Sequence, residues 1–162
     1  MLKSYIMLSP DAVGAAEVDP LDQDVGGIDT SFPLLSPGLY DMEINEASVG
    51  HKKDDPSREV LTIKFVTTLD SLDVKGESLH KGYPIFYRTG LTPTEDMPAK
   101  KVATNLARIL KVCGFKSGVS PRQLTQDPKM VVGRVVRCKV KVQKETDDYP
   151  ASNSISQFVD VE

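Results

Sequence analysis

Residues 133–144, GRVVRCKVKVQK, place cations at alternate positions, a spacing that could bind a row of phosphates. In an extended strand, successive side chains point to opposite faces. The segment therefore predicts two faces, one formed by Val136, Cys138, Val140 and Val142 and the other by Arg137, Lys139, Lys141 and Gln143. Ordinary solvent faces mix charges, because like charges two residues apart repel each other. The uniform sign of Arg137, Lys139 and Lys141, here called the cationic row, indicates a negatively charged partner.

Other side chains offer the same chemistry elsewhere in the chain. Proteins that bind single-stranded nucleic acid combine cations that contact phosphates with aromatic rings that stack on unpaired bases. The further candidate cations are Lys52, Lys53 and Arg58 in the turn-forming segment 50–58, together with Lys64 and Arg88. The candidate rings are Tyr83, Phe86, Tyr87 and Tyr149. Alternation along 83–88 separates Tyr87 from Phe86 and Arg88, so at most one of these two sets is buried.

Each of these features also has an ordinary structural explanation. Aromatic side chains most often pack in the core, and the chain has only ten of them. The lysines of the cationic row can lie over apolar neighbours on a solvated sheet face. We favour nucleic-acid contact for the row, because the neighbouring helix and the turn 50–58 add cations of the same sign. The weaker candidates on that helix are Lys100, Lys101, Arg108 and Lys111.

The distribution of charge is more informative than the net charge of −3. Residues 97–144 hold twelve bases and one acid, for a net charge of +11. The other parts are all acidic, with −5 in residues 1–37, −4 in residues 38–96 and −5 in residues 145–162. A basic block that covers a helix, a loop and a strand is typical of a surface that binds nucleic acid.

The residues that could catalyse a reaction do not form a recognisable set. His51 and His80 are the only imidazoles, and neither has the spacing of a metal ligand. Cys113 and Cys138 lie on the apolar faces of predicted elements, where thiols act as small hydrophobic side chains. The chain has no glycine-rich loop of the kind that binds phosphate. We therefore expect a protein that is not an enzyme and that uses no metal or cofactor.

The hydrophobic pattern predicts the elements that position the candidate residues. Strands are expected at 39–49, 59–69, 83–88, 133–144 and 154–161, and an amphipathic helix at 98–114 lies between the third and the fourth. A short helical turn is expected at 120–124. This order predicts a mainly β fold, an OB-like five-stranded Greek-key barrel with one helix. We expect this domain to occupy residues 38–162, after an extended arm at 1–37 that is acidic and rich in Pro and Gly.

Four segments carry a resemblance to a known family: GLYDMEINEA at 38–47, NLARILKVCG at 105–114, DPKMVVGRVVRCKVKV at 127–142 and YPASNSISQF at 149–158. They resemble phage-encoded single-stranded DNA-binding proteins, many of which are labelled only as domains of unknown function. The resemblance covers roughly residues 36–160. It implies an OB-fold, sequence-tolerant binding of single-stranded DNA and a role in replication or recombination. The chain departs from that pattern in its long acidic arm, in having no Trp and in lacking the acidic tail of bacterial single-stranded DNA-binding proteins.

The expected function is therefore largely sequence-independent binding of single-stranded DNA, which protects or organises it during phage replication or recombination. The expected partners are single-stranded DNA, replication or recombination proteins, and further copies of the chain in a homodimer or higher oligomer. No membrane partner is expected. The start MLKSYIML is too short for a signal peptide or a membrane span, so we expect a cytoplasmic protein, in the host cell if phage-encoded.

Two alternatives stay open at this point. The chain could be a non-enzymatic adaptor or a phage structural protein whose basic face docks on an acidic protein, because fold alone does not decide function. It could also be a small nuclease. The nuclease would require four acids from two separate loops to meet around a divalent ion: Asp54, Asp55, Asp147 and Asp148.

Overall fold

The computed structural model describes residues 19–22, 24–27 and 33–160. The chain divides into two compact units, residues 1–32 and 33–162. In the first unit the described residues form two 3-10 helices, η1 (Pro20–Asp22) and η2 (Val25–Gly27), and most of the predicted arm lies outside the described residues. None of the helices in the described ranges combines the length and the apolar character needed to cross a membrane.

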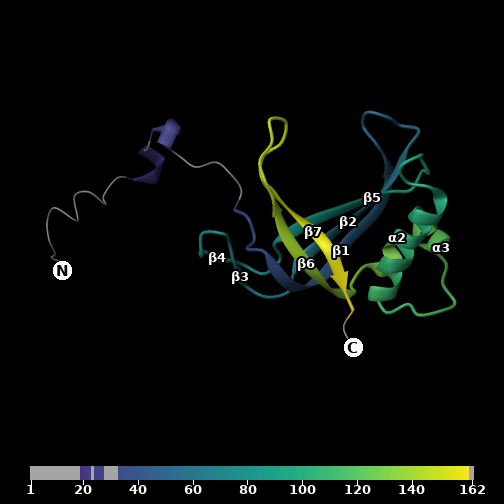
Figure 1. The fold of residues 1–162 in the computed structure, drawn as a ribbon. Helices are drawn as coiled ribbons and strands as arrows, with labels where there is room; N and C mark the ends of the chain where they lie inside the picture. The colour runs from purple at the N-terminus through teal and green to yellow at the C-terminus, as the bar shows by residue number, and fades with distance from the viewer. Residues whose placement is uncertain (1–18, 23, 28–32, 161–162) are drawn as a thin grey trace, which may run out of the picture. The chain divides into compact units, whose positions relative to one another are not determined.

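Five antiparallel strands form the main sheet, in the order β5-β2-β1-β6-β7 (Figure 1). They are β1 (Gly38–His51), β2 (Glu59–Thr67), β5 (Pro84–Gly90), β6 (Val135–Gln143) and β7 (Ser152–Val159). Two further strands, β3 (Ser71–Leu72) and β4 (Ser78–Leu79), form a separate hairpin. The edge strands β5 and β7 contact each other, so the sheet is strongly curved.

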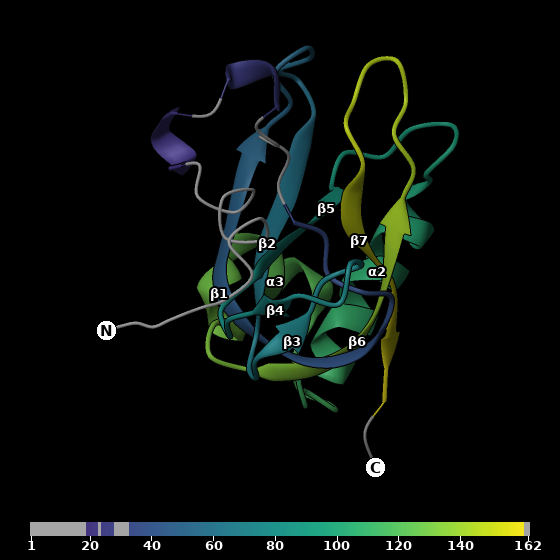
Figure 2. The ribbon, with the colours of Figure 1, turned by 90° about the vertical axis from the view of Figure 1, so that its left-hand side faces the viewer.

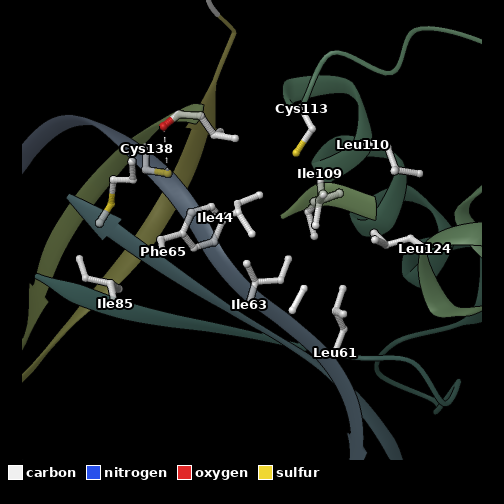
Figure 3. Close-up of a cluster of buried hydrophobic side chains, with 14 of the residues drawn as sticks. Ile44, Leu61, Ile63, Phe65, Ile85, Ile109, Leu110, Cys113, Leu124 and Cys138 are labelled. Atoms are coloured by element: carbon white, nitrogen blue, oxygen red, sulfur yellow. Dashed lines mark hydrogen bonds between the residues drawn. The ribbon is translucent and has the colours of Figure 1, made fainter. Parts of the chain in front are cut away.

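Alternating side chains give the sheet one apolar face, as the sequence pattern predicted. The buried inward positions are Met42, Ile44, Leu61, Ile63, Phe65, Ile85, Val136, Cys138 and Val140. A bulge in β1 between Ile44 and Glu46 shifts the register there, and the inward alternation resumes at Ala47. Figure 3 shows the sheet residues Ile44 and Ile63 facing Ile109 of the helical segment across the core.

The helical segment consists of α2 (Ala99–Val112), α3 (Pro121–Gln126) and the 3-10 helix η3 (Pro128–Val131). Helix α2 buries Val102, Leu106, Ile109 and Leu110 on one face, and its C-cap residue Cys113 is buried too, which confirms the amphipathic helix predicted at 98–114. The helix ends as predicted, because Gly114 adopts a left-handed conformation with φ of +100°. Helix α3 begins with a capping box, in which the side chains of Ser120 and Gln123 each accept a backbone N–H of the other residue.

Two details of the predicted barrel are wrong. The sheet does not close, because β5 and β7 share no backbone hydrogen bond in the described residues, and the rings of Tyr87 and Phe158 meet there instead. In addition, α2 follows the fifth strand of the chain and not the third, because the β3–β4 hairpin precedes β5. Each strand of this hairpin has only two residues, and its turn is held by buried Asp73, which accepts the N–H groups of Lys75 and Glu77 at 2.8 Å.

The second unit begins at Pro33, and the residues before β1 pack with the sheet. Leu35 is fully buried, and its backbone N–H and C=O both bond to the side-chain amide of Asn153, at 2.8 and 2.9 Å. The hydroxyl of Tyr83 donates to the carbonyl of Pro33 at 2.6 Å. Residues 33–36, which sequence analysis assigned to the arm, are therefore anchored to β7 and to the start of β5.

Burial sets the chemistry of the two cysteines. It raises the pKa of Cys113 to about 11 and that of Cys138 to about 12, so both remain thiols at neutral pH. The thiolate is the reactive form. We therefore expect the native protein to react with the disulfide reagent DTNB at less than about one-hundredth of the rate of the urea-unfolded chain at the same pH. The absorbance of the released thionitrobenzoate measures this, and fast reaction of the native thiols would contradict it.

Candidate nucleic-acid interface

Two hairpin loops stand at the same end of the sheet. The first joins β1 to β2 through residues 52–58, and the second joins β6 to β7 through residues 144–151. Figures 1 and 2 show both loops extending beyond the sheet in the same direction. A cavity of about 940 Å³ is lined by residues of both loops, the facing ends of β1, β2 and β5, and the segment before α2. We call this cavity the inter-loop groove.

The inter-loop groove is lined by four of the predicted cations, Lys52, Lys53, Arg58 and Arg88, all of them exposed. Arg58 forms an ion pair with Asp55 at 3.2 Å. Hydrogen bonding from Ser57 lowers the pKa of Asp55, which therefore stays ionised beside Arg58. Within the part of the chain that the structure describes, no ion pair is found for the other three cations. The acids Asp54 and Glu59 also line the groove, so its charge is positive but mixed.

Tyr149 lies in the β6–β7 loop with its side chain 74 % exposed. It lines the inter-loop groove and also a neighbouring hollow that contains Lys141 and Lys144. Two hydrogen bonds fix the turn, since the N–H of Thr146 donates to the Tyr149 carbonyl at 2.9 Å and Thr146 Oγ1 accepts the Tyr149 N–H at 3.1 Å. An exposed ring on a fixed turn, with cations on both sides, can stack on an unpaired base.

Phe86, Arg88 and Lys64 come together on the outer face of the β2–β5 pair. Phe86 is 49 % exposed, and the guanidinium of Arg88 lies over its ring, 5.6 Å from the centroid. Lys64 is the cross-strand partner of Phe86 and forms an ion pair with Glu46 at 3.4 Å. Because Arg88 also lines the inter-loop groove, the outer face and the groove form one continuous surface.

Tyr87 points to the opposite side of β5. Its ring packs edge to face on Phe158, with centroids 5.2 Å apart, and burial raises the pKa of its hydroxyl. The predicted alternation along β5 is therefore confirmed. Of the two arrangements that the sequence left open, Phe86 with Arg88 is the exposed pair, whereas Tyr87 is a residue of the core edge.

The cationic row has one neutralised member and two exposed lysines. Arg137 donates to Asp41, its cross-strand partner in β1, through Nε at 2.9 Å and Nη2 at 3.3 Å. The hydrogen bond from Arg137 lowers the pKa of Asp41, so the carboxylate stays ionised and compensates the guanidinium charge. Lys139 and Lys141 are exposed, and among the described residues neither has an ion pair. Lys139 and Lys141 are therefore the two residues of the cationic row that are available to an anionic partner.

Replacing Asp41 with asparagine is expected to release Arg137 to an anionic ligand. One additional phosphate contact on a single strand would raise affinity about fivefold at 0.1 M salt and steepen the salt dependence by about 0.7 in the log–log slope. Fluorescence-anisotropy titration of a labelled thymidine oligomer measures both quantities. An unchanged slope in Asp41→Asn would show that Arg137 does not reach the bound strand.

The acids that a nuclease would require are distributed over both loops. Asp54 lines the inter-loop groove, while Asp147 and Asp148 belong to the β6–β7 loop. In the described residues, no group of three or more His, Cys, Asp or Glu side chains is placed to hold a metal ion. His51 lines the groove. His80 lies between β4 and β5, and its Nδ1 is 4.0 Å from Oδ1 of Asp70.

Sequence reasoning missed two parts of this surface. Lys144 opens the β6–β7 loop and shares a hollow with Tyr149, and its place directly after the cationic row could have identified it. Thr92, Thr94 and Met97 line the groove from the segment between β5 and α2. No sequence signal marks these three residues, because they are uncharged and their position depends on how the chain turns before the helix.

Residues 22–159 match a family model described as a protein of unknown function, DUF669. The matched range contains both hairpin loops and every strand of the main sheet. The comparison with curated proteins gave no match.

Proposed function

Since the chain belongs to the DUF669 family, whose description assigns no activity, we propose from its own surface that it binds single-stranded DNA with little sequence preference. The bound strand would be protected or organised during phage replication or recombination, in the host cytoplasm and without a chemical step. This biological setting rests on the resemblance to phage single-stranded DNA-binding proteins.

The observation that carries the proposal is the position of Tyr149 between two groups of cations. On one side its ring shares a hollow with Lys141 and Lys144, and on the other it shares the inter-loop groove with Lys52 and Lys53. A strand that crosses the ring can place phosphates on both groups while one base stacks on the phenol. This combination of charges and a ring fits an unpaired strand better than a duplex, whose base faces are already stacked.

The outer face of the β2–β5 pair extends the same path. A strand that leaves the groove beside Arg88 meets the exposed ring of Phe86 next, because Arg88 lies over that ring. Phe86 would offer a second base a stacking surface, with Arg88 contributing cation–π attraction and a phosphate contact.

We also propose that the curved sheet is an open OB-like barrel. The strand order β5-β2-β1-β6-β7 and the contact between the edge strands support this. OB barrels bind oligonucleotides on the face of their second and third strands and with the loops that join strands one to two and four to five. Counted within the five-stranded sheet, these are the β2–β5 face and the two hairpin loops described above.

Anisotropy titration of a labelled thymidine oligomer of about 30 nucleotides, longer than the roughly 4–16 covered by one OB fold, tests the proposal. About five phosphate contacts would give a log–log salt slope of about −3 to −4. The matching duplex is the control and is expected to bind more weakly at every salt concentration. No binding of the oligomer at low salt would contradict the proposal and favour an adaptor that docks on an acidic protein.

Tyr149→Ala is expected to weaken binding of the thymidine oligomer by about 5- to 150-fold, because stacking contributes about 1–3 kcal/mol per base. Tyr149→Phe keeps the ring and is expected to retain wild-type affinity. Because residue 149 is exposed on the loop, we expect both variants to keep the wild-type thermal unfolding temperature, which serves as the control for folding. Equal affinities of the alanine and phenylalanine variants would show that no base stacks on this residue.

A further inference from the structure

Side chains, and not backbone hydrogen bonds, hold the seam between the edge strands β5 and β7 in the described structure. The rings of Tyr87 and Phe158 meet there, and helix α2 contacts β7 beside them. A cavity of about 290 Å³ remains among β5, β7 and α2. Its volume is close to the lower limit of about 300 Å³ for small-molecule sites. We call this cavity the seam pocket.

The seam pocket has a mainly polar lining with one cation. Arg108 and Asn105 both line it from α2, on whose surface residues three apart are neighbours. Ser156 and Gln157 line it from β7, and Ile155, Phe158 and Tyr87 supply the apolar part. No acid lines the pocket, and within the described residues Arg108 forms no ion pair.

Arg108 differs in this respect from the other cations of its helix. Lys100, Lys101 and Lys111 line neither the seam pocket nor the inter-loop groove. Burial raises the pKa of the Tyr87 hydroxyl, and a hydrogen bond with Thr89 and, to a smaller extent, the nearby Arg108 guanidinium oppose that rise. The seam pocket thus combines the guanidinium of Arg108 with the side-chain amides of Asn105 and Gln157 and the rings of Tyr87 and Phe158.

The seam pocket adjoins the inter-loop groove. Asn105 Nδ2, which lines the pocket, donates to the sulfur of Met97 at 3.5 Å, and Met97 lines the groove. Tyr87 and Arg88, neighbours in β5, line the pocket and the groove respectively. A strand that lies in the groove therefore has a short path to the pocket past the end of β5.

We propose that the seam pocket binds one nucleotide of the single strand held in the inter-loop groove. The guanidinium of Arg108 would contact the phosphate, since its planar fork matches phosphate oxygens. The amides of Asn105 and Gln157 would bond to the edge of the base, because an amide offers both a donor and an acceptor. This inference rests on the proposed function and extends the bound strand beyond the surface that the sequence identified.

Arg108→Ala and Lys111→Ala form a matched pair that tests the phosphate contact, because each removes one exposed cation from α2. Arg108→Ala is expected to weaken binding of the thymidine oligomer about fivefold at 0.1 M salt and to lower the salt slope by about 0.7. Lys111→Ala is expected to leave affinity within about twofold. Equal effects of the two variants, with binding otherwise tight, would overturn the seam pocket alone. A wild-type chain that binds no oligomer would overturn the proposed function together with it.

The base contact is tested with the double variant Asn105→Ala/Gln157→Ala on two oligomers of equal length, one of thymidine and one without bases. The double variant is expected to lose severalfold in affinity for the thymidine oligomer and nothing for the abasic one. Arg108→Ala is expected to weaken both, because both carry phosphates. Equal loss for the two oligomers in the double variant would overturn the assignment of the amides to the base.

Discussion

Replacing Lys52, Lys53 and Arg88 together with alanine is expected to weaken binding of a thymidine oligomer about 100-fold at 0.1 M salt. Each phosphate contact on a single strand contributes about 0.7 to the log–log salt slope, which corresponds to roughly fivefold in affinity at 0.1 M relative to 1 M. Three contacts therefore multiply to about 100-fold and lower the slope by about 2. Anisotropy titrations at several salt concentrations measure both numbers.

The matched control removes three cations from α2, with Lys100, Lys101 and Lys111 replaced by alanine. The net charge of the protein changes by the same amount, but these side chains line neither the inter-loop groove nor the seam pocket. We expect this variant to lose less than about threefold in affinity, through long-range electrostatics alone. Equal losses in the two triple variants would mean that DNA responds to overall charge and does not lie in the groove.

Phe65→Ala is expected to cost about 3–5 kcal/mol of unfolding free energy, which is a large part of the stability of a domain of this size. Phe65 is fully buried in β2, and its ring lies 5.7 Å from that of Phe158. Removing it leaves a cavity among the buried side chains of the core, where Figure 3 shows Phe65, and removes the ring contact with Phe158 in β7. Urea unfolding followed by circular dichroism measures the change.

Phe86→Ala, on the opposite face of the same sheet, is the control for that measurement. The ring of Phe86 is half exposed and the Arg88 guanidinium lies over it, so we expect the stability of the protein to change by less than about 0.5 kcal/mol. We expect DNA affinity to follow the reverse order, with a loss in Phe86→Ala. A Phe86→Ala protein as unstable as Phe65→Ala would contradict the assignment of the two faces.

The strands and the main helix could be predicted because their signals are local. Alternation along 133–144 predicts Cys138 inside and Lys139 outside, as in β6, and the amphipathic pattern at 98–114 predicts α2. Each of these patterns depends only on residues two to four positions apart, which a single sequence displays directly. The β3–β4 hairpin has no such pattern, because two-residue strands are too short to alternate.

Contacts that depend on strand register could not be predicted. Arg137 and Asp41 become partners only because β6 pairs with β1 in one register. The sequence around either residue does not indicate its partner. The same holds for Tyr149, whose place beside the β1–β2 loop depends on how far the curved sheet brings the two hairpins together. Sequence reasoning therefore identified the cations and rings but not which of them are neutralised and which share a groove.

The open seam between β5 and β7 also could not be predicted from local sequence patterns. Alternation separates Tyr87 from Phe86 but does not decide which of them points inward, and the contact between Tyr87 and Phe158 depends on how the sheet curves. The sequence makes Arg108 a weaker candidate, because a helix that packs across the end of the barrel can point its cations away from the groove, and the helix pattern does not reveal that β7 lies beside Arg108. The structure gives it two amide neighbours, Asn105 and Gln157, and hence a more specific expected role.

The most direct test of single-strand binding in the inter-loop groove is a two-dimensional ¹H–¹⁵N spectrum of the labelled protein, recorded during titration with a short thymidine oligomer. The largest shifts are expected for the amides in the segments 52–58, 88–92 and 141–149, which contain residues that line the groove and the adjoining hollow. The β3–β4 hairpin, residues 71–79, is the internal reference and is expected to stay unchanged. Shifts that leave both hairpin loops unperturbed, or no shifts at saturating oligomer, would contradict binding in the groove.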